Sequence, residues 1–154
     1  MLRLTSALLG FLIAAQAADL PSKKYLNLAA VKAMVAVAEQ EAQKRNVRLT
    51  ICIVDDSGNL LFLQRGDGAT LNTVEYAMRK AKHAALYGSP SRTALESLKK
   101  GNLGILTQPG AFPDGGGVPI RVDGQLLGGI ACSGAASAID EEVAQMAADV
   151  LARK

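Results

Sequence analysis

Two pairs of strand-like segments, each joined by a tight turn, constrain the fold of this 154-residue chain most. The pairs are 49–54 (LTICIV) with 60–65 (LLFLQR), and 118–122 (VPIRV) with 125–133 (QLLGGIACS). Gly58 lies in the first turn, and Asp123 with Gly124 forms the second. Turns this short join antiparallel neighbours, whereas parallel neighbours need a crossover of a dozen or more residues. The chain is therefore predicted to contain two β-hairpins.

Helical periodicity fills the intervals around these hairpins. Apolar residues recur every three or four positions after Asn27, a residue type that caps helix N-termini. The expected helices span residues 28–45, 70–87, 91–101 and from 137 onward. Because helices separate the hairpins, we expect an α+β fold with an antiparallel β-sheet of four to five strands covered by helices.

The last helix has its own start signal. Ser137 is followed three residues later by Asp140, a spacing typical of a helix N-terminus. The apolar stripe predicted to be buried is Ile139, Val143, Met146 and Val150.

The N-terminus indicates export. Residues 1–17 contain Arg3, an apolar run over 7–15 and the small-residue pattern Ala15-Gln16-Ala17, which is typical of a cleaved signal peptide. A membrane anchor is the alternative, but the run is shorter than the roughly 20 residues of a bilayer span. We therefore expect a periplasmic or secreted protein with no stable membrane span, whose mature chain, 18–154, forms one domain.

Charge and cysteine content narrow the function classes. The 17 Lys and Arg residues are scattered, apart from a cluster at 79–82 (RKAK), and this scatter disfavours a nucleic-acid-binding protein. Cys52 and Cys132 each lie in a strand-like apolar run. They are expected to be buried free thiols, with a cross-sheet disulfide as the alternative in an oxidising compartment.

A glycine run follows Phe112 in the segment 112–117 (FPDGGG). Gly115, Gly116 and Gly117 precede a strand, so no helix N-terminus is available there to bind phosphate. Glycine permits close approach of another chain or ligand. We therefore expect this loop to contact a flat ligand or a neighbouring subunit.

His83, the single histidine, lies in a polar stripe of the second predicted helix. At about 100° per residue, Tyr76, Lys80, His83 and Tyr87 share a face that differs from the apolar face of that helix. Such a stripe suits a planar anionic ligand, with imidazole binding a metal, Lys80 or Arg79 binding carboxylates, and the Tyr rings stacking. The alternative is a solvated or subunit-contacting helix face.

Charged residues flank the first hairpin and allow a catalytic hypothesis. Asp67, after the second strand, is a candidate general base, with Arg65 as an anion clamp and His83 as an acid. The alternative is structural, because Asp side chains commonly bond the local backbone in turns.

Four segments, taken together and in order, resemble the GlcG/HbpS-like haem-binding family, also called haem-degrading or domain of unknown function 336. They are 54–69 (VDDSGNLLFLQRGDGA), 80–85 (KAKHAA), 112–135 (FPDGGGVPIRVDGQLLGGIACSGA) and 140–147 (DEEVAQMA). The resemblance implies a helix-covered antiparallel sheet with a profilin-like, two-layer outline that assembles into dimers and larger oligomers. It also implies export and haem binding, which some members show.

The resemblance also bears on single residues. It implies that Arg65, Asp67 and the glycines at 115–117 shape a pocket and a subunit contact. Where this chain has His83, family members often have threonine, and some are implied to bind haem through it.

These observations together predict an exported homo-oligomer that binds haem or another tetrapyrrole. The predicted cofactor-binding residues are His83, Lys80, Tyr76, Tyr87, Phe112, Gly115, Gly116 and Gly117, with His83 as ligand of the haem iron. The alternative is a catabolic enzyme, a lyase, isomerase or hydrolase, acting on an organic acid through Arg65, Asp67 and His83. A purely structural oligomer is a third possibility.

Overall fold

A computed structural model describes residues 19–152, so the predicted signal at 1–17 lies outside the described residues and stays a prediction. The elements are α1 (Leu28–Lys44), β1 (Thr50–Asp55), β2 (Leu60–Arg65), α2 (Thr73–Tyr87), α3 (Arg92–Lys99), the 3-10 helix η1 (Leu103–Thr107), β3 (Gly117–Val122), β4 (Gln125–Ser133) and α4 (Ser137–Asp149). The predicted helices and hairpins are all present, whereas η1 was not predicted. Within the described range, no helix is long and apolar enough to cross a membrane.

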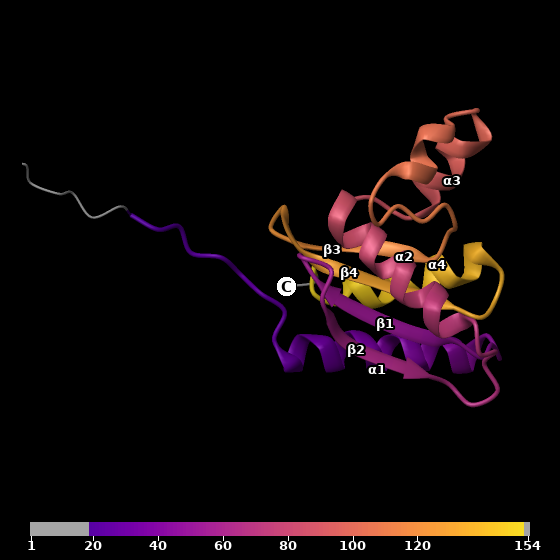
Figure 1. The fold of residues 1–154 in the computed structure, drawn as a ribbon. Helices are drawn as coiled ribbons and strands as arrows, with labels where there is room; N and C mark the ends of the chain where they lie inside the picture. The colour runs from indigo at the N-terminus through magenta and orange to yellow at the C-terminus, as the bar shows by residue number, and fades with distance from the viewer. Residues whose placement is uncertain (1–18, 153–154) are drawn as a thin grey trace, which may run out of the picture.

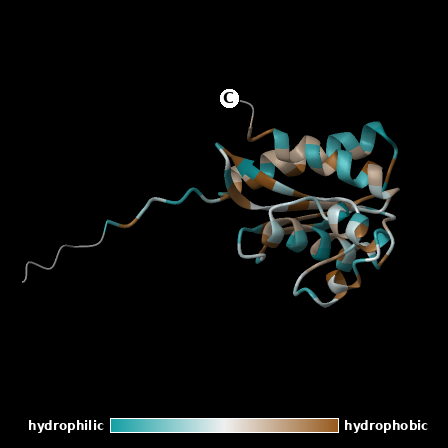
Figure 2. Cartoon of the chain, turned by 90° about the horizontal axis from the view of Figure 1, so that it is seen from above, coloured by the Kyte–Doolittle hydropathy of each residue, from teal (hydrophilic) through white to brown (hydrophobic). Residues whose placement is uncertain are grey.

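The four strands form one antiparallel sheet in the order β2-β1-β4-β3 (Figure 1). The two hairpins meet through β1 and β4, where Thr50 lies opposite Ser133 and Asp55 opposite Gly128. The α+β class and the antiparallel sheet are confirmed. The two-layer outline is wrong, because helices cover both faces of the sheet and make three layers (Figure 2).

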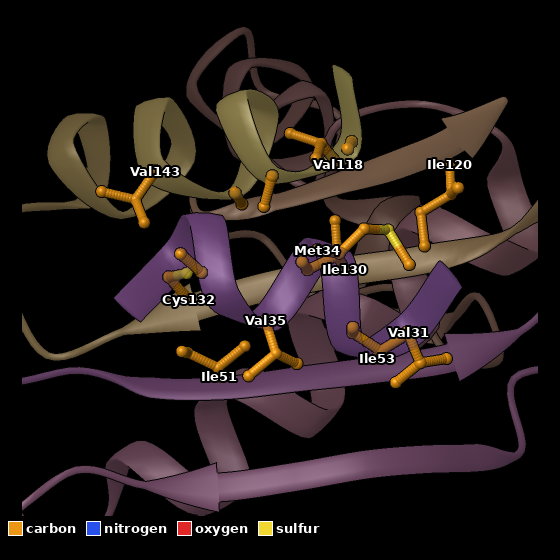
Figure 3. Packing of buried hydrophobic residues seen from close by; sticks show 14 of the residues in the cluster. Val31, Met34, Val35, Ile51, Ile53, Val118, Ile120, Ile130, Cys132 and Val143 are labelled. Carbon is orange, nitrogen blue, oxygen red and sulfur yellow. The ribbon is translucent and has the colours of Figure 1, made fainter. Parts of the chain in front are cut away.

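One face of the sheet packs against α1 and α4 (Figure 3). Asn27 caps the N-terminus of α1 as predicted, because its side chain accepts a hydrogen bond from the Ala30 N–H at 2.8 Å. The helix then places branched and thioether side chains over the strands. The labelled residues of this core are Val31, Met34, Val35, Ile51, Ile53, Val118, Ile120, Ile130, Cys132 and Val143. Burial of each large apolar side chain stabilises the fold by about 1.5–3 kcal/mol.

The other face packs against α2 through small side chains. Ala77, Ala81 and Ala85 meet Cys52 and Ala131 in a second, smaller apolar cluster. The helix lies so close that a Cβ at position 129 of β4 would be 2.2 Å from the Ala81 carbonyl oxygen. Glycine at 129 and alanines on the helix therefore set the depth at which α2 sits on the sheet.

The predicted stripe of α4 is only partly correct. Val143 is fully buried, but Ile139, Met146 and Val150 are half-buried, and the other buried positions are Asp140, Ala144, Ala147 and Ala148. Ser137 does not cap the helix with its side chain. Its hydroxyl instead donates to Asp114 Oδ1 at 2.8 Å, a tertiary contact that helical periodicity does not reveal.

Cys52 and Cys132 are free and buried, as expected. Cys52 belongs to the cluster under α2, whereas Cys132 belongs to the core under α1 and α4. The two thiols therefore lie on opposite faces of the sheet, which excludes the alternative of a disulfide between them. Burial raises the pKa of Cys52 to about 12, so its unreactive thiol form prevails at neutral pH.

Candidate functional site

The polar stripe of α2 lies beneath the segment that follows η1. Tyr76 and Tyr87 stay about 40% exposed, but Lys80 and His83 are each only 2% exposed. The expectation that His83 lies off the core was therefore wrong. Helical periodicity separates the face of α2 on the sheet from the rest of the helix, but it does not show that residues 109–117 fold back and cover a second face.

His83 holds this covering segment through one ring nitrogen. Its Nδ1 accepts a hydrogen bond from the Phe112 N–H at 3.1 Å, and its ring stacks on Tyr87 with 4.7 Å between centroids. Burial lowers the pKa of His83, which favours the neutral ring at neutral pH. Since Nδ1 is an acceptor, the neutral ring carries its proton on Nε2, and Nε2 is buried without a hydrogen-bond partner.

Phe112 packs against the stripe, although it comes from a different segment. Its ring meets Tyr76 edge-to-face with centroids 5.4 Å apart, and the Arg79 guanidinium carbon lies 4.4 Å from its centroid. The Tyr87 hydroxyl donates to the Pro109 carbonyl at 2.8 Å. The covering segment is thus held by aromatic, cation–π and hydrogen-bond contacts along more than two turns of α2.

Lys80 does not present a free cation to a ligand. Its Nζ lies 3.0 Å from Asp114 Oδ2 and 3.3 Å from Asp140 Oδ2, and the side chains of Lys80 and Asp140 are both 2% exposed. Burial raises the pKa of the Asp140 carboxyl, while hydrogen bonding from the Ala135 N–H and the charge of Lys80 oppose that shift. The proposed role of Lys80 in binding carboxylates is wrong in this arrangement, because two carboxylates already pair with it.

The glycine run packs against its own chain. A Cβ at Gly116 would lie 2.7 Å from the Cys132 carbonyl oxygen, and one at Gly117 would lie 2.3 Å from the Lys80 carbonyl oxygen. Gly116 also has a φ of 121°, which side-chain-bearing residues rarely adopt. These two glycines therefore allow β3 to start directly against α2. Gly115 lines the pocket between α3 and α4, whereas Gly116 and Gly117 pack against Cys132 and Lys80, so the prediction of a three-glycine ligand wall is not correct for these two.

The three candidate catalytic residues do not converge in one chain. Arg65 lies opposite Thr50 in the sheet, and Thr50 Oγ1 is 2.7 Å from the hydroxyl of Thr73 at the start of α2. His83 follows ten residues later on that helix, which corresponds to about 15 Å. Asp67 lies two residues after Arg65, the last residue of β2. The arrangement required for the organic-acid enzyme hypothesis is therefore not formed within the described chain.

Among the pockets formed by the described residues, we compare three that lie beside α2 or between α3 and α4. The smallest, about 290 Å³, is lined by Arg79, Lys82, Leu106, Gln108, Gly110 and Ala111. A second, about 390 Å³, lies over the β1–β2 turn and shares Arg79 and Lys82 with the first. The largest, about 550 Å³, lies between α3 and α4, where Gly115 and Ser137 form part of its lining.

Sequence reasoning missed the partners of Lys80. In the sequence, Asp140 was interpreted as a helix-start residue, and Asp114 was only part of the glycine-rich segment 112–117. Both lie far from Lys80 in sequence, so neither spacing nor periodicity relates them. The available signal was chemical, because a lysine among small apolar helix residues requires an anionic partner when it is buried.

Comparison with known proteins matches most of the chain. Protein GlcG of Escherichia coli K12 is 35% identical over 112 residues, which cover 73% of this chain and 84% of GlcG. The crystal structure of a double mutant of Streptomyces reticuli HbpS has a TM-score of 0.81 at 30% identity, with 92% of this chain and 97% of that one covered. The crystal structure of a PduOC:heme complex has a TM-score of 0.75 at 26% identity, with coverage of 81% and 94%.

The family comparison covers the domain almost completely. Residues 26–149 match the model described as "Haem degrading protein HbpS-like", a range that contains the four sheet strands and the four α-helices. The same conclusion follows from GlcG and from HbpS, each at 30% identity or more. The chain therefore belongs to the HbpS-like family, as its sequence motifs indicated.

Proposed function

We propose that this protein binds haem through His83 on the covered face of α2. The observation that carries the proposal is the neutral, buried imidazole of His83, whose Nε2 has no hydrogen-bond partner. Imidazole is a common axial ligand of haem iron. Membership of a family described as haem-degrading, and likeness to a protein solved as a heme complex, support the same ligand.

The surrounding residues fit a flat apolar macrocycle. Tyr87 stacks on His83, Phe112 and Tyr76 add two further aromatic rings along the stripe, and the Arg79 guanidinium lies over the Phe112 ring. The bound iron would supply a Lewis-acidic, redox-active centre. The chain's own residues would supply the imidazole ligand, an apolar contact surface and shielding from water.

Ligation by His83 requires one rearrangement. A ligand nitrogen must present a lone pair, but the Phe112 N–H already occupies that of Nδ1, and the resulting tautomer places the proton on Nε2. Transfer of the proton to Nδ1 would free the lone pair of Nε2. The Nδ1 proton would then point at the Phe112 N–H, which is also a donor. Either nitrogen therefore binds iron only after the Phe112 amide separates from His83, so haem binding is coupled to movement of the covering segment.

A haem titration of the mature protein with His83→Gln tests this proposal. Glutamine can accept the Phe112 N–H bond but is a far weaker iron ligand than imidazole, so it retains the local fold better than alanine would. We expect the parent protein to give a saturable Soret shift, and the variant to lose that shift and to bind haem at least tenfold more weakly.

Thermal unfolding of both proteins without haem provides the control, because His83 is buried and its replacement affects stability. A variant that is folded at the titration temperature and keeps the parental Soret spectrum and affinity would show that the iron is held elsewhere. Absence of any saturable shift in the parent would reject haem binding.

A further inference from the structure

We propose that Arg79 and Lys82 form a carboxylate-binding site at the 290 Å³ pocket between α2 and the segment after η1. The identification of its ligand as the carboxylate arms of haem rests on the function proposed above. The proposal of the site itself is argued from the charge and geometry of its residues. Arg79 and Lys82 take the carboxylate-binding role that the sequence analysis gave to Lys80 or Arg79.

The charged side chains that line this pocket are all positive. Its lining contains Arg79 and Lys82 and no Asp or Glu. Among the described residues, neither cation forms an ion pair, in contrast to Lys80 with its two carboxylates. The adjacent 390 Å³ pocket shares both cations but includes Glu75, which would repel an anion. The 290 Å³ pocket is therefore the better place for a carboxylate.

Both cations have restricted side chains. The Arg79 guanidinium rests over the Phe112 ring at 4.4 Å from its centroid. The Lys82 stem lies over Gly58, where an added Cβ would be 3.1 Å from Lys82 Cγ and 3.5 Å from Cε. Because the two residues are three apart on a helix, their side chains project from neighbouring positions. Less conformational entropy is then lost when a carboxylate binds.

Phe112 connects this pocket to His83. Its ring contacts Arg79, while its N–H donates to His83 Nδ1. A ligand whose iron binds His83 and whose carboxylates bind Arg79 and Lys82 would thus engage the two residues that Phe112 contacts through its N–H and through its ring. The pocket volume of about 290 Å³ admits carboxylate arms or a small organic acid, and it is too small for a complete macrocycle.

The carboxylate can come from haem or from a free organic acid, and esterification separates these sources. We compare binding of iron protoporphyrin IX and of its dimethyl ester by the parent, by Arg79→Gln/Lys82→Gln and by the matched control Lys32→Gln/Lys100→Gln. The control removes two exposed lysines that line none of the three pockets.

We expect the parent and the control to bind the diacid about tenfold or more tightly than the ester, because only the ionised carboxylates accept charge-assisted hydrogen bonds from the two cations. The Arg79→Gln/Lys82→Gln variant should bind both forms equally and keep the parental Soret position. Equal preference for the diacid in the parent and in this variant would overturn the proposal, while leaving haem binding by His83 intact.

A calorimetric titration with malonate, without haem, tests the free-acid source. Saturable malonate binding that Arg79→Gln/Lys82→Gln abolishes and the control retains would support the carboxylate site, even if haem does not bind and the proposed function fails. If the parent shows neither malonate binding nor a preference for the diacid, the carboxylate site is rejected.

Discussion

At the scale of single residues, Lys80 shows how a charge changes its role when tertiary structure covers it. The ammonium group is shared between Asp114 and Asp140 at 3.0 and 3.3 Å. It thereby links α2 to the loop before β3 and to α4. Removal of one partner from a buried ion pair leaves an uncompensated charge, which commonly costs about 3–5 kcal/mol.

Lys80→Met is therefore expected to reduce the free energy of unfolding by about 3 kcal/mol or more at pH 7. Asp140→Asn should cost less, because Lys80 keeps Asp114 and the Asn carbonyl can still accept the Ala135 N–H. The double variant should lose less than the sum of the two single losses, since the partners share one interaction. Urea unfolding of the three variants and the parent measures these differences.

The pH dependence of Lys80→Met provides a second check. The pKa of Asp140 is already raised by burial, and loss of the lysine should raise it further. A folded-state pKa above the unfolded value makes the folded state bind more protons, so the penalty is absent below the unfolded pKa of about 4 and grows as pH rises from there through the raised folded-state pKa. A stability deficit of Lys80→Met that grows on acidification would contradict the assigned pairing.

At the scale of elements, contacts between backbones determine how α2 lies on the sheet. Gly129 permits the approach of α2 to β4, and Gly117 permits the approach of β3 to the Lys80 carbonyl. Neither position has a positive φ, so their requirement for glycine is steric. They let the backbone of α2, the helix that carries Lys80, lie directly against β3 and β4.

Gly117→Ala should be strongly destabilising, because its Cβ would lie 2.3 Å from a carbonyl oxygen of the α2 backbone. Overpacking of this kind commonly costs about 1–3 kcal/mol. Gly104→Ala is the matched control, since Gly104 also lacks a positive φ and its added Cβ would meet only the Asn102 side-chain oxygen at 3.2 Å. Thermal unfolding should show a much larger loss for the first variant, and equal losses would refute the steric role.

At the scale of the whole molecule, large apolar side chains remain exposed around η1. Leu103 and Leu106 are 68% and 60% exposed, and Leu86 of α2 is 44% exposed. Figure 1 shows α3 lying apart from the other helices, above α2. Exposed leucines on and beside this extension are the reason to test the homo-oligomer, which stays a prediction.

We expect the mature protein to sediment as a homo-oligomer at micromolar concentration. Leu103→Ser/Leu106→Ser should shift it toward smaller species while its secondary structure is retained, because neither side chain is buried in the described chain. Leu20→Ser, at an exposed residue before α1, is the control. A parent protein that sediments as a monomer of about 14 kDa would contradict the prediction.

The sequence by itself determined the local structure of this protein and its family. The two short turns required antiparallel hairpins, Asn27 capped α1, and linked motifs across the chain indicated the HbpS-like family. These features depend on neighbours within a few residues or on recurrent motifs, which a linear sequence contains directly. The aromatic and histidine stripe of α2 was also predicted as a group, because residues three or four apart on a helix share a face.

Only the tertiary structure decided which of those residues are accessible. Residues 109–117 fold back onto α2, where the Phe112 N–H donates to His83 and Asp114 pairs with Lys80. The second partner of Lys80 is Asp140 of α4, which lies 60 positions after Lys80 in the sequence. This folding buries Lys80 and His83 and leaves Arg79 and Lys82 exposed. Helical periodicity describes the directions of side chains from one axis, but burial depends on what a distant segment places over them.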